Sequence, residues 1–224
     1  MSIAIAQLVG NDDAALVEID GHRLHRDVSQ DWQALQSQAQ QAGFSLSIAS
    51  AYRSFDRQLA IWNAKARGER PVLDSCEQPV DVMQLNERDR LFAILRWSAL
   101  PGASRHHWGT DIDVYDSAAV AEDYCVQLTA AEVNEGGVFA AMHDWLDTQI
   151  QIDKAFGFYR PYADEKGGIA PERWHLSHRP TSAAYQAQLT AEALYAFIES
   201  QTELFLREAV LENFEQIYAQ YVSC

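Results

Sequence analysis

Short segments of alternating apolar and polar residues recur along this chain between longer helical patterns. Residues 15–26 alternate around Gly21 and predict a hairpin, and FSLSIAS at 44–50 predicts a strand. TDIDVYD at 110–116 and ERWHLSH at 172–178 predict two further strands, and 156–162 predicts a strand or turn. Strands this short, separated by helices, predict a mixed architecture.

The helical patterns lie between these strands. Apolar residues at helical spacing predict helices over 29–42, 55–67, 86–98 and 138–152, the second with Leu59, Ile61, Trp62 and Ala66 as its buried side. Residues 68–85 contain two prolines and no clear period, which predicts an ordered loop or lid. The tail, 181–222, predicts two amphipathic helices. Since neither could bury its apolar stripe alone, we expect them to cap a single domain spanning 1–224.

Charge restricts the partners of this chain. Its 224 residues carry 17 Lys and Arg against 32 Asp and Glu, a net charge of −15. Nucleic acid and anionic membranes require a basic face, so neither is expected as the main partner. The N-terminus has no basic, signal-like region, and no apolar run reaches membrane-spanning length. We therefore expect no membrane insertion and a cytoplasmic protein as encoded, or a cell-envelope protein if a leader is missing.

The segment SRHHWGTDID, residues 104–113, combines several groups that can hold a metal ion. It offers the His106 imidazole on a loop and the Asp113 carboxylate on a strand seven residues later. A turn at Gly109 would bring both to one ion. His107 is the rival ligand, but the spacing to Asp113 favours His106. The three cysteines of the chain contain no CxxC pair and indicate neither a thiolate site nor a disulfide framework.

The segment ERWH, residues 172–175, supplies a second imidazole and a carboxylate. Residues three apart on a strand face opposite sides, so Glu172 and His175 share a site only if the backbone bends or Glu172 enters from the preceding loop. His106, Asp113 and His175 would then form a two-nitrogen, one-oxygen zinc site with an open position. Zinc lowers the pKa of bound water, and Glu172 is the predicted general base.

The segment SAYRSFDRQ, residues 50–58, supplies a fixed cation. Arg53 at the end of a strand is predicted to stabilise an oxyanion or to bind a substrate carboxylate. Gln58 and Ser104 are predicted to give neutral hydrogen bonds to substrate. Trp174 is predicted to form a wall of the pocket.

These three segments, in this order, resemble the VanY-type zinc D-alanyl-D-alanine carboxypeptidases and their dipeptidase and endopeptidase relatives. The resemblance covers about 34–178. It implies an α+β fold in which a small antiparallel sheet carries the zinc site, with helices packed around it and a C-terminal helical extension. It also implies that His106, Asp113 and His175 are metal ligands and Glu172 is the catalytic base. Arg53 would polarise the scissile carbonyl.

The resemblance implies one Zn²⁺ per chain and a peptidoglycan peptide, or another substrate containing D-Ala-D-Ala. We expect hydrolysis at a D-amino acid, foremost as a D-alanyl-D-alanine carboxypeptidase. An L-alanyl-D-glutamate endopeptidase, a D,D-dipeptidase and a non-catalytic zinc-containing peptide-binding module remain alternatives. The sequence predicts no particular oligomeric state.

Overall fold

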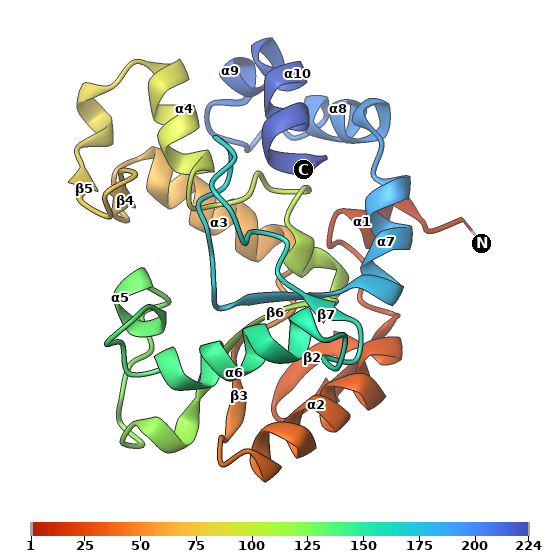
Figure 1. Cartoon of the computed structure of the whole chain (residues 1–224). Helices are drawn as coiled ribbons and strands as arrows, with labels where there is room; N and C mark the ends of the chain where they lie inside the picture. Colours follow the sequence, from red (N-terminus) through yellow and green to blue (C-terminus); the bar gives the residue numbers. More distant parts are fainter. Residues whose placement is uncertain (1, 224) are drawn as a thin grey trace.

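The computed structural model describes residues 2–223, and its centre is a four-stranded antiparallel sheet (Figure 1). The strand order is β3 (Leu46–Ser50), β6 (Asp111–Asp116), β8 (His175–His178) and β7 (Phe158–Tyr159). The sequence predicted strands at β3, β6 and β8, and a strand or turn at β7. With its surrounding helices, this sheet confirms the predicted α+β class.

The strand register decides which side chains meet. In the pairing of β6 with β8, Asp113 lies opposite His175 and Asp111 lies opposite Ser177. In the pairing of β3 with β6, Ser50 lies opposite Asp113, after an irregularity between Ile48 and Ser50. The end of β3, the middle of β6 and the start of β8 therefore converge at Asp113.

A first core cluster joins the sheet to the helices α2 (Ser29–Gln41) and α6 (Ala140–Gln151). Its buried members include Trp32, Ile112 and Leu146. The hairpin predicted around Gly21 is present as β1 (Leu16–Ile19) and β2 (His22–His25), and it contributes Leu24 to this cluster. This cluster fixes the strands that carry the metal-site candidates.

A second core cluster forms around α3 (Phe55–Ala66) and α4 (Glu87–Leu95) and includes much of the tail. The predicted buried side of α3 is partly wrong. Trp62 and Ala66 are buried, but Leu59 and Ile61 are only half-buried, and Gln58 is buried instead. The helix turns this way because Gln58 Nε2 donates a hydrogen bond to Ala99 O at 2.6 Å.

The tail contains more helices than predicted. The two expected helices are replaced by α7 (Arg179–Gln188), α8 (Ala191–Glu199), α9 (Arg207–Glu212), α10 (Phe214–Ile217) and a π-helical turn at Tyr218–Val222. The first expected helix is divided where Thr190 caps α8 through a hydrogen bond from Ala193 N. The tail lies beside α3 and α4 (Figure 1), and Trp62 Nε1 donates to Phe205 O at 2.9 Å. It therefore completes the second core.

The remaining elements are short. The expected loop at 68–85 contains a small hairpin, β4 (Val72–Leu73) and β5 (Pro79–Val80), followed by a 3₁₀ turn at Val82–Gln84. Further helices are α1 (Ile5–Leu8) and α5 (Ala130–Val133), with 3₁₀ turns at Arg26–Val28, Arg105–Trp108 and Ser117–Ala119. Within residues 2–223, we find no helix with the length and apolarity needed to cross a bilayer.

We predict that the tail is part of the folding unit. Ile217 in α10 is fully buried in the second core, so Ile217→Ala should lower the free energy of unfolding by about 2–5 kcal/mol. Urea denaturation measures this change. The control Ile152→Ala, at a half-exposed side chain, should change it by less than about 0.5 kcal/mol. Equal, small effects of both variants would show that the tail does not stabilise the domain.

Candidate metal centre and pocket

Three side chains from separate parts of the fold meet at one point. His106 lies in the 3₁₀ turn Arg105–Trp108, Asp113 lies on β6, and His175 begins β8. All three are buried, and they offer ligand atoms that lie within 4.8 Å of one another. His106 Nε2 is 3.5 Å from Asp113 Oδ2, and His175 Nδ1 is 3.2 Å from Asp113 Oδ1. The structure thus brings together the predicted ligand set.

Gly109 makes this meeting possible. It ends the 3₁₀ turn with φ +66°, a left-handed conformation that glycine adopts without strain. A Cβ at this position would lie 2.8 Å from His25 N and 2.5 Å from Leu16 Cδ2. The turn predicted at this glycine therefore also packs closely against the β1–β2 hairpin.

Hydrogen bonds orient both imidazoles toward the common point. His106 Nδ1 lies 2.9 Å from Ala51 O, a carbonyl that can only accept, so Nδ1 carries the proton and Nε2 presents its lone pair. His175 Nε2 donates to Asp111 Oδ1 at 3.0 Å, which leaves Nδ1 facing Asp113. Ligating histidines in metal sites make this kind of outer hydrogen bond.

Asp113 gives a further sign that a cation belongs here. Its Oδ1 is buried, and its neighbour His175 Nδ1, at 3.2 Å, carries no proton when the neutral ring donates through Nε2 to Asp111. A buried carboxylate oxygen that lacks a donor carries a desolvation cost, which a bound cation would offset. Two nitrogens and a carboxylate oxygen are ligands that zinc accepts, so the residues present fit a zinc ion.

Asp111 supports the site from behind His175. Its carboxylate accepts hydrogen bonds from Arg105 Nε at 2.8 Å, Thr110 Oγ1 at 2.6 Å and Ser177 Oγ at 3.1 Å. Burial by itself would raise the pKa of Asp111, but the Arg105 guanidinium and the hydrogen bonds hold it well below the ordinary value. Asp111 is therefore a fixed negative charge that holds His175 in one orientation.

The two histidines differ in their electrostatic surroundings. Burial lowers the pKa of His106 to about 4, so its ring is neutral at pH 7 and free to ligate a metal ion. Burial also lowers the pKa of His175, but hydrogen bonds to Asp111, Asp113 and Glu172 outweigh it and raise that pKa well above the ordinary value. The carboxylates around His175 therefore favour a positive charge at this point.

Glu172 reaches the site from the loop before β8. Its Oε2 lies 3.5 Å from His175 Nδ1, and its side chain is 15% exposed. His175 N donates to Glu172 O at 3.0 Å, closing a turn just before the strand begins. The backbone bend considered from the sequence is therefore present. Glu172 stands beside the metal-site candidates with access to the pocket.

Arg53 faces the pocket from the end of β3. Its Nη1 donates to Gln58 Oε1 at 2.8 Å, and its backbone N donates to His106 O at 3.1 Å. Gln58 is 0% exposed and is absent from the pocket lining, so the predicted contact between Gln58 and substrate is wrong. Gln58 instead positions Arg53. Ser104 does line the pocket, and its hydrogen bond to substrate stays a prediction.

His107, the rival ligand, makes hydrogen bonds to backbone groups outside the metal-site candidates. Gly102 N donates to His107 Nε2 at 3.1 Å, so the ring proton is on Nδ1, which donates to Arg53 O at 2.6 Å. Both ring nitrogens are used. His107 holds the backbone of Arg53 in place.

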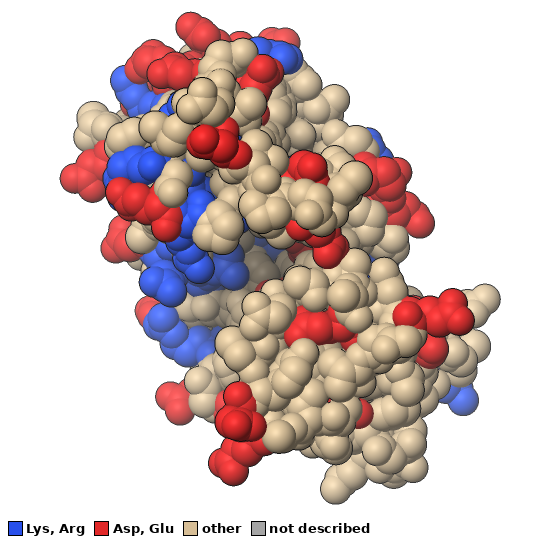
Figure 2. Space-filling view, turned by 90° about the vertical axis from the view of Figure 1, so that its left-hand side faces the viewer, with Lys and Arg blue, Asp and Glu red and all other residues tan. Residues whose placement is uncertain are grey.

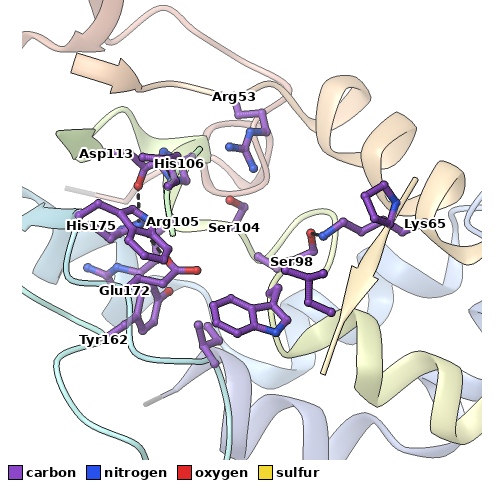
Figure 3. Close-up of a pocket in the computed structure, with 17 residues that line it drawn as sticks. Arg53, Lys65, Ser98, Ser104, Arg105, His106, Asp113, Tyr162, Glu172 and His175 are labelled. Atoms are coloured by element: carbon purple, nitrogen blue, oxygen red, sulfur yellow. Dashed lines mark hydrogen bonds and ion pairs between the residues drawn. The ribbon is translucent and has the colours of Figure 1, made fainter. Parts of the chain in front are cut away.

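A cavity of about 280 Å³ opens over the metal-site candidates (Figure 3). Trp174 lines it, as predicted, and Trp97 lines it as well. The remaining walls are Arg53, Lys65, Pro71, Leu73, Ser98, Ala99, Ser104, Arg105, His106, Asp113, Leu128, Tyr162, Ile169, Glu172 and His175. Pro71 and Leu73 come from the segment 68–85, so the predicted loop forms part of the wall.

Sequence reasoning missed several of these residues. Asp111 lies within the segment already identified, and its place two residues before Asp113 puts it on the same face of the strand. That spacing was the available signal. Lys65, Trp97 and Tyr162 come from other parts of the chain, and no local pattern distinguishes them from ordinary helix and loop residues.

Comparison with known proteins identifies the family. Residues 21–181 match the VanY family, described as D-alanyl-D-alanine carboxypeptidase. The chain therefore belongs to the VanY family, which makes it a hydrolase of peptidoglycan-type peptides. The matched range includes the predicted core 34–178 and stops at the start of the tail.

Individual relatives share part of the sequence or the fold. An uncharacterised Haemophilus influenzae protein is 40% identical over 105 residues, covering 45% of this chain and 72% of the relative. The structure of VanYB in complex with D-alanine-D-alanine shares the fold with a TM-score of 0.52 at 21% identity, covering 84% of this chain and 89% of VanYB. The LD-carboxypeptidase LdcB has a TM-score of 0.53 at 21% identity, covering 89% and 79%.

A further VanY structure carries the metal. The VanY D,D-pentapeptidase mutant solved in complex with Zn(II) has a TM-score of 0.51 at 20% identity, covering 82% of this chain and 88% of VanY. In the present chain, the possible metal site is His106, Asp113 and His175.

We predict that Asp111 determines metal affinity. Asp111→Asn removes the negative charge behind His175 and should weaken zinc binding about 10- to 100-fold. Competition with a chromophoric chelator measures the affinity. The control Asp116→Asn alters a buried carboxylate at the far end of the same strand, which bonds Ser45 N and Ala118 N, and should leave zinc affinity unchanged. Equal affinities of Asp111→Asn and the unmodified chain would contradict this role.

Proposed function

We propose that this protein is a zinc-dependent D-alanyl-D-alanine carboxypeptidase that releases a terminal D-alanine from a peptidoglycan-type peptide. The observation that carries the proposal is the buried cluster of His106, Asp113 and His175, with Glu172 and Arg53 beside it at one small pocket. A purely binding module requires the ligands but neither a base nor an oxyanion partner.

In this proposal, His106, Asp113 and His175 would hold the zinc ion through the two imidazoles and the carboxylate. When bound, zinc supplies a Lewis acid that polarises a carbonyl and lowers the pKa of water. The protein's own groups do the rest. Arg53 donates hydrogen bonds to the carbonyl oxygen as negative charge develops on it, and Gln58 keeps the guanidinium aimed there.

Glu172 is the proposed proton carrier. Its carboxylate accepts the proton of the attacking water and then delivers it to the leaving amine, so that one side chain serves both steps. Tyr162 O accepts a hydrogen bond from Glu172 N at 2.9 Å, which fixes the backbone of this residue. Trp97 and Trp174 give the pocket two apolar walls beside the reacting groups.

The size of the pocket favours release of a single small residue. Its volume of about 280 Å³ lies just below the range of small-molecule sites, which is about 300 to 1,000 Å³. An L-alanyl-D-glutamate endopeptidase must accommodate peptide on both sides of the scissile bond. A D,D-dipeptidase remains the second candidate because its leaving residue is the same D-alanine.

We predict that Glu172→Gln abolishes turnover and leaves zinc in place. The amide keeps the shape of the side chain but cannot accept and return a proton, so kcat should fall about 100- to 10,000-fold. Product analysis on a pentapeptide ending in D-Ala-D-Ala measures turnover, and metal analysis of the same sample measures zinc. Near-normal activity of the variant would refute the proposed role of Glu172.

We predict one zinc ion per chain and chelator-sensitive release of D-alanine. Removal of the metal should stop D-alanine release, and added Zn²⁺ should restore it. The pentapeptide, the free D-Ala-D-Ala dipeptide and a cross-linked muropeptide should be compared side by side. Hydrolysis of the dipeptide alone would establish the dipeptidase, and cleavage only within the muropeptide stem would establish an endopeptidase.

A further inference from the structure

Lys65 lies on the wall of the pocket away from the metal-site candidates. It comes from the last turn of α3, is half-buried, and lines the same cavity as Glu172 and His175. Figure 3 shows its side chain directed at Ser98, with Ser104 between this pair and His106. Lys65 Nζ donates a hydrogen bond to Ser98 Oγ at 2.8 Å.

Lys65 has no carboxylate in direct contact within the described part of the chain. Among residues 2–223, no carboxylate oxygen lies within 4.0 Å of Lys65 Nζ, and Glu172 of the same pocket attracts the ammonium only from further away. Two arginines of the same region are paired: Arg105 with Asp111 and Arg96 with Glu165. A desolvated cation without a counter-ion carries a free-energy cost. An anionic group of a ligand would offset it.

Positive charges lie close together on this side of the pocket, and they lower the pKa of both Arg53 and Lys65. Arg57 and Arg70 repel the Arg53 guanidinium, and Arg70 and Arg53 repel the Lys65 ammonium. Burial and these neighbours outweigh the attraction of Glu172 and lower the pKa of Lys65 to about 8, so most of it is protonated at pH 7. In Figure 2, Lys and Arg side chains gather along one edge of a hollow on a face that otherwise carries many acidic residues. An anion is therefore attracted to this wall.

The two ends of the pocket have opposite character. Asp113 and Glu172 stand at the metal end, and Lys65 with Ser98 stands at the other. With the scissile carbonyl beside Arg53, the released residue would reach this wall if it extends toward Lys65 and Ser98. That residue carries the free carboxylate of the peptide.

We propose that Lys65, together with Ser98, binds a carboxylate of the residue that is released and so selects substrates that carry one. This inference rests on the proposed function, and it adds the residue that recognises the chain end. The terminal α-carboxylate is the expected source, and a side-chain carboxylate of the same residue has the same chemistry.

Paired substrates test the proposal. We compare kcat/KM for a pentapeptide ending in D-alanine with the same peptide ending in D-alaninamide. Lys65→Met should lower kcat/KM for the free acid roughly 10- to 100-fold, mainly through KM, and leave the amide unchanged. Lys65→Arg should retain much of the preference. The control Lys154→Met alters an exposed lysine outside the pocket and should change neither value.

A third peptide separates the two sources. It ends in D-glutamate with an amidated α-carboxylate, so that only the side chain is anionic. A loss confined to this peptide in Lys65→Met assigns the side-chain carboxylate, and a loss confined to the D-alanine acid assigns the terminal one. Equal losses on acid and amide, or no loss on any peptide, would overturn the proposal.

A measurement of binding affinity tests the role of Lys65 independently of catalysis. In zinc-loaded Glu172→Gln, calorimetry compares the affinity for D-Ala-D-Ala with that for its C-terminal amide. Adding Lys65→Met should remove the preference for the free acid. If the unmodified protein cleaves none of the peptides but this preference exists and depends on Lys65, the proposed function fails and the inference stands. Absence of the preference refutes the inference.

Discussion

The pairing of β6 with β8 is the constraint on which the rest of the structure depends. It places Asp113 opposite His175, so this pair provides two of the metal-site candidates. It also places Asp111 opposite Ser177, and Asp111 accepts hydrogen bonds from both Ser177 and His175. A slip of one residue would turn Asp111 and Asp113 to the other face of the sheet. The buried apolar partners Ile112 and Leu176 hold this register, because they belong to the first core.

Charge balance in the buried site follows from this register. Asp111, Asp113 and Glu172 surround His175, while Arg105 is the permanent cation bound to Asp111. A second positive charge is favoured at the point where His106 Nε2 and His175 Nδ1 converge. The same low-dielectric surroundings that penalise unpaired charges therefore favour a bound metal ion.

The C-terminal tail is connected to this site through Arg105, which donates to Asp111 behind His175. Arg105 Nη1 donates to Gln186 of α7, and Gln186 Nε2 donates to Val222 O at 2.7 Å. The tail also contacts the loop before Glu172, since a Cβ at Gly168 would meet Gln220 O at 2.1 Å. Tail helices that lie outside the matched family range thus pack against both the arginine behind His175 and the loop that carries the proposed base.

The sequence by itself indicated the strands of the central sheet, the main helices and the candidate residues His106, Asp113, His175, Glu172 and Arg53, because periodicity and short motifs are local properties of the chain. It did not indicate the small hairpin of β4 and β5. Only the tertiary structure decided that Gln58 positions Arg53, that His107 is fully hydrogen-bonded and that the tail is divided into several helices. It also decided that Lys65 faces the pocket without an acidic partner among the described residues. These facts depend on which distant segments pack together, and burial and pairing of that kind leave no periodic signal in the sequence.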